Sequence, residues 1–212
     1  MSPTITRDLP PMTLRAAFNP RSVNLPKRTV ELTWSTGAKV LRGYFDKFYE
    51  ELSLDPKHVR LGRLNGGAPL LDAHNSYELR GVLGVVEGGT ATVDGKQGKA
   101  VVRFAKAEDD PLADAIFRKV QDGIIQNVSV GYRVHKFEKI EDVEIKIPTY
   151  RAIDWEPYEV SLVPMGADAG AGVRGAAICE LTTCEFVTSG LAASVLSDAD
   201  RNRALFLARV RR

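Results

Sequence analysis

Short segments in which apolar and polar residues alternate run through most of this chain. The clearest covers residues 127–135, where apolar side chains alternate with polar ones or glycine. A period of two predicts a β-strand with one apolar and one polar face. The polar face carries Ser129, and Gly131 leaves open space beside its hydroxyl, whereas the apolar face carries Val128, Val130, Tyr132 and Val134.

Further segments alternate in the same way or are rich in β-branched and aromatic residues, which favours strands. Turns are predicted between several of them, at Thr36-Gly37, Gly88-Gly89 and Asp94-Gly95. Residues 39–52 are also compatible with an amphipathic helix, but Val, Tyr and Phe favour a strand that returns along the preceding one. The predicted strands cover residues 28–35, 39–45, 68–75, 79–86, 100–105 and 158–163, and 151–156 is expected to be extended up to a break at Pro157.

Helices are predicted where capping residues precede a suitable pattern. Asp55-Pro56 is typical of a helix start, and we expect a short helix from there to about residue 64. Asp110-Pro111 begins the clearest helix, which Gly123 ends. Its expected apolar stripe consists of Leu112, Ile116 and Val120, with Ala113, Phe117 and Ile124 flanking it.

Many short strands, two or three helices and no alternation of strand with helix indicate a mixed, mainly β fold, either an antiparallel barrel or a sandwich with helices outside. Prolines and little periodicity predict a flexible N-terminal arm over residues 1–27, followed by one domain over 28–164. A shift to Gly, Ala, Asp and Ser predicts a linker and tail over 165–212. Within this tail, Ser197 with Asp200 is typical of the start of an arginine-rich basic helix.

The composition is that of an ordinary soluble globular protein, with 44% hydrophobic and 26% charged residues in a chain of 212. A formal net charge of +2 does not predict an obligate nucleic-acid or membrane partner. We expect no membrane span and no secretory signal, because long apolar runs are missing. Cys179, Cys184 and three scattered histidines predict neither a disulfide framework nor a metal site, and no cofactor motif is present.

Three polar residues on or beside predicted strands suit a hydrolytic site. A nucleophilic serine needs a base for its proton and a third group that orients the base. Ser129 supplies the hydroxyl, His74 ends an apolar strand, and Glu159 lies on the polar face of 158–163. Histidine titrates near neutrality, so it can take up a proton and later return it. Ser129 lacks the Gly-x-Ser-x-Gly elbow of α/β-hydrolases.

Other residues compete for two of these roles. Asp72, two residues before His74, and Asp154 are alternative orienting carboxylates. His135 shares the nominal face of the serine but lies about 20 Å further along an extended strand, which makes it a weaker candidate for the base. His58 is expected at the surface. Ordinary structural roles are open for each of these residues.

Three segments of the chain contain these candidate residues. They are Pro69-Leu-Leu-Asp-Ala-His74-Asn, Gly123-Ile-Ile-Gln-Asn-Val-Ser129-Val-Gly-Tyr-Arg and Trp155-Glu-Pro-Tyr-Glu159-Val-Ser-Leu-Val-Pro-Met-Gly-Ala-Asp. Together they resemble the prohead (capsid maturation) serine proteases of tailed phages, in the family's order: the histidine, a helix, the serine strand, and a Glu-Val-Ser-Leu-Val-Pro strand. The resemblance covers about residues 28–174, and it departs from the family at Met165-Gly166-Ala167, where a proline-alanine pair is often seen.

The resemblance implies a fold like that of herpesvirus assemblin, an antiparallel β-barrel surrounded by a few helices, here with flexible N- and C-terminal extensions. It implies a serine endopeptidase with Ser129 as nucleophile and His74 as base. The third member differs among related proteases, and Glu159 is our choice for it. The oxyanion would be held by backbone N–H groups or an arginine, for which Arg133 and Arg103 are candidates.

The same resemblance implies substrates and a place of action. These would be the scaffolding protein, a scaffolding segment of the major capsid protein and often the protease itself, inside a procapsid assembling in the host cytoplasm. No metal, cofactor, nucleic acid or membrane is expected to take part, and a homo-oligomer and a longer natural chain stay open. The alternatives are a non-enzymatic capsid assembly factor on the same barrel and a general binding module unrelated to phages.

Overall fold

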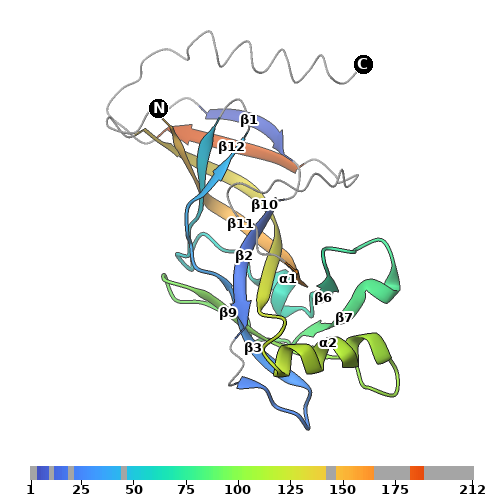
Figure 1. The fold of residues 1–212 in the computed structure, drawn as a ribbon. Helices are drawn as coiled ribbons and strands as arrows, with labels where there is room; N and C mark the ends of the chain where they lie inside the picture. Colours follow the sequence, from blue (N-terminus) through green and yellow to red (C-terminus); the bar gives the residue numbers. More distant parts are fainter. Residues whose placement is uncertain are drawn as a thin grey trace, which may run out of the picture.

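Strands dominate the computed structural model, whose described residues are 4–9, 12–18, 22–43, 47–141, 147–164 and 182–188 (Figure 1). The helices α1 (Gly62–Asn65) and α2 (Pro111–Gln121) and a 3₁₀ turn at Leu79–Gly81 accompany them. The prediction of a mainly β fold with few helices is confirmed. The strands are β1 (Thr4–Leu9), β2 (Met12–Phe18), β3 (Thr29–Ser35), β4 (Val40–Arg42), β5 (Phe48–Leu52), β6 (Pro69–Asp72), β7 (Val82–Val86), β8 (Thr92–Val93), β9 (Gly98–Phe104), β10 (Asn127–Ile140), β11 (Thr149–Leu162) and β12 (Thr182–Thr188).

The strands pair into one sheet in the order β1-β12-β10-β2-β3-β9-β7-β6-β11-β5-β4, with β8 beside β9. An additional pairing joins the long strands β10 and β11, which lie side by side in Figure 1. The order has two ends, β1 and β4, so the sheet as a whole is not a closed barrel.

The sheet is mixed rather than wholly antiparallel. Strand β11 runs parallel to β5 and β6, and β10 runs parallel to β12. The prediction of an antiparallel arrangement is therefore wrong for these three pairs. Parallel neighbours need a long connection, and the chain between β6 and β11 is long enough to return in the same direction.

The core lies against the apolar faces of the alternating segments. In β10, Val128, Val130, Tyr132 and Val134 are all buried, as the period of two predicts. Trp155 of β11 meets the ring of Tyr132 edge to face, with centroids 5.7 Å apart. Strand β10 is thus held in the core by one face, and its small polar residues lie on the other.

The clearest predicted helix is confirmed as α2, which lies beside β7 and β9 (Figure 1). The Asp110 carboxylate accepts hydrogen bonds from the backbone N–H groups of Leu112 and Ala113, each 3.0 Å long. The expected stripe is shifted, because Leu112 is exposed and its neighbour Ala113 is buried. The buried apolar residues, with their spacing of three and four, are Ala113, Ile116, Phe117 and Val120, and Asp114 is buried beside them.

Two predictions about the ends of the chain need correction. Strands β1 and β2 lie within the predicted flexible arm 1–27 and pair with β12, β10 and β3. Strand β12 lies within the predicted tail. The prolines that indicated a loose arm, such as Pro10 and Pro11, are not among the residues of these strands. The remainder of the predicted tail, including the basic helix expected from Ser197, lies outside the described residues.

Two local predictions between β3 and β6 are also wrong. The strand over 39–45 was expected to return along 28–35, yet β4 pairs with β5, and β3 pairs with β2 and β9. The helix expected from Asp55 is only the four-residue α1 at Gly62–Asn65. The Asp55 carboxylate accepts the backbone N–H of Lys57 at 2.9 Å, which closes a turn in place of capping a helix.

Strand β11 continues through Pro157, where a break was expected. Gly131 pairs with Glu159 whereas its neighbour Tyr132 pairs with Pro157, so Tyr158 is an extra residue on β11. This is a β-bulge, a place where a strand tolerates proline because one ladder position is already lost. The bulge lies directly beside Glu159.

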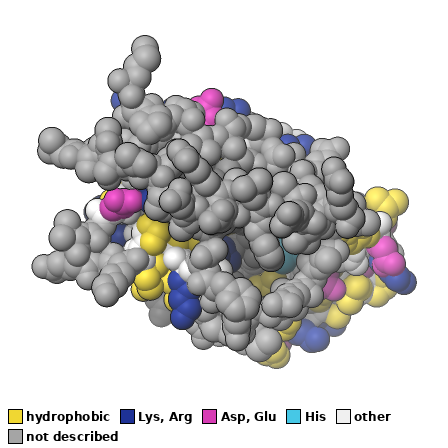
Figure 2. Space-filling model, turned by 90° about the horizontal axis from the view of Figure 1, so that it is seen from above, with side chains coloured by type: hydrophobic (Ala, Val, Ile, Leu, Met, Phe, Trp, Pro, Cys, Tyr) yellow, Lys and Arg dark blue, Asp and Glu magenta, His cyan; other side chains and the backbone are white. Residues whose placement is uncertain are grey.

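The surface view in Figure 2 shows basic and acidic side chains interspersed with hydrophobic ones on the coloured part of this face. Within the described residues, no helix is both long and apolar enough to cross a membrane. No group of three His, Cys, Asp or Glu side chains in that part of the chain is arranged to hold a metal ion.

Candidate active site

The candidate site lies across three adjacent strands, with β11 in the middle. Strand β10 pairs with β11 antiparallel, and β6 pairs with its other edge in parallel. Ser129 is directly opposite Ser161, and Gly131 is directly opposite Glu159. Residues that oppose each other in a ladder project to the same face. Ser129, Glu159 and Ser161 therefore share the face that lies away from the β10 core residues.

A turn after β6 brings His74 onto this face. Ala73 and His74 both have positive φ, 46° and 63°, although neither is glycine. The Ala73 N–H donates to the carbonyl oxygen of Leu162 at 2.8 Å, which keeps the turn against β11. The His74 N–H then donates to the hydroxyl oxygen of Ser161 at 3.1 Å. Left-handed backbone at two successive non-glycine residues is strained and is typical of functional sites.

The His74 ring is bound to Glu159. Its Nδ1 lies 2.7 Å from Glu159 Oε1, and the Ser161 hydroxyl donates to Glu159 Oε2 over 2.6 Å. Both carboxylate oxygens thus accept hydrogen bonds, the pattern of an ionised carboxylate. This pattern assigns the ring proton to Nδ1 and leaves the lone pair on Nε2, the form of histidine that acts as a base. The Glu159 side chain is 7% exposed and that of His74 30%, so the ring reaches solvent and its partner does not.

Ser129 is the neighbour of this network across the ladder. Opposed residues of an antiparallel pair have Cβ atoms about 4.5–5.5 Å apart, so the Ser129 side chain lies beside that of Ser161, to which His74 is bonded. Gly131 makes the arrangement feasible, because a Cβ there would lie 2.2 Å from Glu159 Oε1. The structure thus binds the His74 ring to Glu159 of β11 and places Ser129 on the adjacent strand β10, opposite Ser161.

Comparison with known proteins shows the family of the chain. Residues 24–183 match the sequence model of the caudovirus prohead serine protease family. The chain belongs to this family. A relative, the major capsid protein of Halomonas phage phiHAP-1, is 36% identical over 111 residues, which are 52% of this chain but only 18% of the relative. The chain thus spans less than a fifth of the curated relative that it matches. No solved structure matches.

The two arginines that are candidates for binding the oxyanion in this prohead protease family member lie on different strands. Arg133 is on β10, four residues beyond Ser129, and its guanidinium lies over the ring of Tyr158, 5.6 Å from the centroid. Its Nε is buried without a hydrogen-bond partner among the described residues. Arg103 is on β9 and paired with Glu87. In the strand order β2 and β3 separate β9 from β10, so Arg103 is not brought to Ser129.

Two of the four competing residues, Asp154 and His58, have other partners. Asp154 forms two hydrogen bonds with Arg60, each 2.6 Å long. Asp72 ends β6, where the strained turn that follows directs the His74 ring to Glu159 instead. His58 Nδ1 lies 2.8 Å from Ser53 Oγ. Burial lowers the pKa of His135, six residues along β10 from Ser129.

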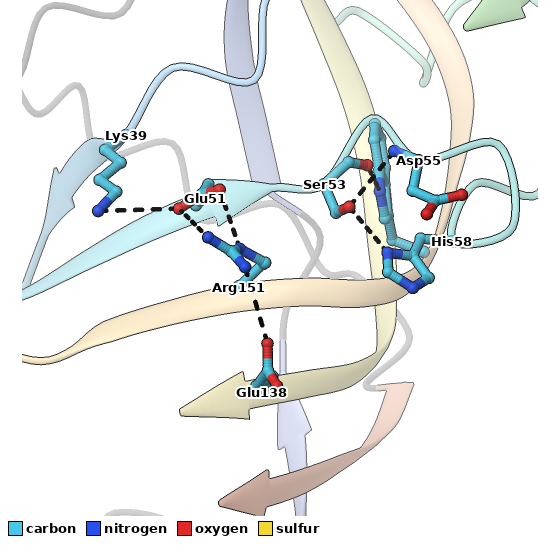
Figure 3. Close-up of polar contacts among 8 residues, drawn as sticks. Lys39, Glu51, Ser53, Asp55, His58, Glu138 and Arg151 are labelled. Carbon is cyan, nitrogen blue, oxygen red and sulfur yellow. Dashed lines mark hydrogen bonds and ion pairs between the residues drawn. The ribbon is translucent and has the colours of Figure 1, made fainter. Parts of the chain in front are cut away.

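A hollow of about 780 Å³ lies at the other end of β11, beside β5. Figure 3 shows its polar side chains bound to each other. Arg151 donates to Glu51 at 2.9 Å and lies 3.9 Å from Glu138. Arg151 and Glu159 are eight positions apart, about 26 Å along a strand, so this hollow is not part of the candidate site.

Burial of Cys184 raises the pKa of its thiol to about 12, which removes it as a thiolate nucleophile near neutral pH.

Two features of the site are not evident from the sequence patterns. The first is the role of Ser161, which accepts from one site residue and donates to another. Its signal is weak, namely a second polar residue two positions after Glu159 on an otherwise apolar strand. The second is the contact of Gly131 with Glu159, which depends on the pairing of two strands.

Proposed function

We propose that this chain is a serine endopeptidase of capsid maturation, with Ser129 as nucleophile, His74 as base and Glu159 as the group that orients the base. The single observation that carries the proposal is the 2.7 Å contact of His74 Nδ1 with Glu159, which lies two ladder positions from Ser129. Membership of the prohead protease family supports the same reaction. The nucleophile, the base and the orienting carboxylate are the three parts that such a reaction needs.

The reaction is acyl transfer from a peptide to Ser129 and then to water. His74 Nε2 takes the proton of the Ser129 hydroxyl as Oγ attacks the peptide carbonyl carbon, and Glu159 stabilises the imidazolium that forms. The proton then passes to the leaving amine as the C–N bond breaks. A water molecule, deprotonated by His74, attacks the acyl group, and Ser129 recovers its proton as the new carboxylic acid leaves.

The negative oxygen of the tetrahedral intermediate needs donors. Arg133 is the arginine that we propose for this role, because it lies on the serine strand, stacked beside the residue that precedes Glu159. Backbone N–H groups are the alternative donors. Arg103, paired with Glu87 on β9, is left out of the proposal.

The proposed substrates are capsid-related polypeptides, and the proposed place of action is a procapsid assembling in the host cytoplasm. The naming of the phiHAP-1 relative as a major capsid protein supports a substrate in or attached to the capsid protein. Scaffolding protein and the chain itself belong to the same proposal. We also propose that β10-β2-β3-β9-β7-β6-β11 is the family's barrel, because β10 pairs with β2 along one edge and β11 along the other.

The test is co-expression with the major capsid and scaffolding proteins of the same virus, followed by intact mass of every chain. We expect defined cleavage products with the native sequence and none with Ser129→Ala. Cleavage that persists in Ser129→Ala would exclude this serine as the nucleophile. If neither the native chain nor Ser129→Ala causes cleavage but both change the yield of closed shells, the chain is a non-enzymatic assembly factor.

A further inference from the structure

The hydroxyl of Ser161 connects the two residues that prepare the serine for attack. Its oxygen accepts the backbone N–H of His74 at 3.1 Å, and its proton goes to Glu159 Oε2 at 2.6 Å. Ser161 is fully buried, so water does not compete for either bond. The Ser161 oxygen therefore contacts both the backbone of the base, His74, and the carboxylate of the orienting residue, Glu159.

The donor and the acceptor in the bond between His74 and Ser161 are fixed by their chemistry. A backbone N–H can only donate, so the Ser161 oxygen must accept from His74. Its single proton is then directed to Glu159 Oε2. With that oxygen occupied, Glu159 accepts the His74 ring proton on Oε1, 2.7 Å from Nδ1. The chain of bonds starts and ends on His74, and it keeps the lone pair on Nε2.

The same hydroxyl also holds the backbone that carries the ring. Ala73 and His74 adopt positive φ values, and such backbone persists only where the surroundings hold it. Two bonds to β11 do so: Ala73 N–H to Leu162 O and His74 N–H to Ser161 Oγ. Without the second bond, the peptide of His74 loses its contact with the strand that carries Glu159.

We infer that Ser161 is a positioning residue of the site, which sets both the place of the His74 ring and the nitrogen that carries its proton. The inference rests on the proposed function, since its purpose is to prepare His74 as a base. Ser161 does not touch the reacting atoms and acts through His74 and Glu159.

Proton NMR tests the network without any peptidase activity. A histidine Nδ1–H held by a carboxylate gives a resonance far downfield of ordinary amide protons. We expect this resonance in the full chain carrying Ser129→Ala, with its loss in Ser129→Ala/Glu159→Gln as the assignment. It should also be lost in Ser129→Ala/Ser161→Ala. An unchanged resonance after removal of the Ser161 hydroxyl would overturn the inference. This result stands even if Ser129 proves not to be the nucleophile, so the two proposals fail separately.

Labelling of the serine with a fluorophosphonate tests the kinetic consequence. Ser161→Ala should lower the maximal labelling rate by about ten- to a hundredfold, the usual effect of losing a hydrogen bond to a charged group, with the half-saturating probe concentration changed less than about twofold. Ser161→Thr retains the hydroxyl and should recover most of the rate.

Ser35→Ala is the matched control, because Ser35 is also fully buried on a strand and accepts one backbone N–H, from Gly37. It should label at the wild-type rate. Thermal unfolding midpoints of all variants separate positioning from folding. An equal loss in Ser35→Ala and Ser161→Ala would overturn the inference, as would a Ser161→Thr protein that unfolds like wild type but labels no faster than Ser161→Ala.

Discussion

A single methyl group at position 131 should disable the site while leaving the sheet intact. Gly131 is opposite Glu159 on the neighbouring strand, and the carboxylate of Glu159 lies across it. A Cβ at this position would lie 2.2 Å from Oε1 and 2.8 Å from Cδ of that side chain. The backbone of Gly131 does not require glycine, since it is not among the residues with positive φ. The three atoms nearest to the added Cβ all belong to Glu159, so the conflict is with this side chain.

The size of the effect follows from these distances. Ordinary contact begins at 3.4 Å, so Oε1 must retreat by about 1.2 Å from its 2.2 Å approach. The bond from His74 Nδ1 is 2.7 Å long, and it stretches only to about 3.2 Å before it is lost. Misplacement of a catalytic group by about 1 Å typically costs about a hundredfold in rate, or about 2.7 kcal/mol.

The assay is the rate at which Ser129 reacts with a fluorophosphonate, followed by intact mass. We expect Gly131→Ala to react about a hundredfold more slowly than the native protein. Its thermal unfolding midpoint should be close to that of the native protein. Gly62→Ala is the matched control, because a Cβ there has no neighbour within 4 Å. A Gly131→Ala protein that reacts at the native rate would refute the role of Glu159 in orienting His74.

Two further predictions concern stability. Burial, together with the nearby Glu50 charge, raises the pKa of Tyr132 well above its usual value, so its hydroxyl stays a neutral donor to the buried Glu50 carboxylate at 2.7 Å. Tyr132→Phe should lower the free energy of unfolding by about 1.5–3 kcal/mol in urea titration, and a change below about 0.5 kcal/mol would contradict this reading. The hydrogen bond from Arg28 lowers the pKa of Asp114, so its stabilising effect is full above about pH 4 and disappears as the pH falls through the lowered value. Asp114→Asn should therefore unfold at a lower temperature than wild type at pH 7, by a margin that shrinks below pH 4; a margin independent of pH would count against the ion pair.

Local patterns predict those parts of the fold that local physics determines. The period of two in β10 and the capping residues of α2 each depend on neighbours within a few positions, and both are observed. Strand partners are different, because pairing depends on residues far away in the chain. The expected hairpin of 28–35 with 39–45 is replaced by pairing of β3 with β2 and β9.

The candidate site shows the same division. Residue chemistry, order and the family resemblance lead to Ser129, His74 and Glu159 as candidates; the structure binds the His74 ring to Glu159 and places Ser129 opposite Ser161 on the adjacent strand. The choice of Glu159 over Asp72 depends on the left-handed turn at His74. The sequence does not indicate this conformation, because no glycine is present at the turn. The contribution of Ser161 depends on the parallel pairing of β6 with β11, which the sequence patterns do not contain.

The wide spacing of the site along the chain has a consequence for timing. His74 and its carboxylate partner are 85 positions apart, and the serine lies between them on a third strand. Contacts of such large separation form late, after the entropy of closing the loops has been overcome. Under the proposed function, a nascent or partly folded chain therefore has no peptidase activity, and cleavage begins only after the chain has folded.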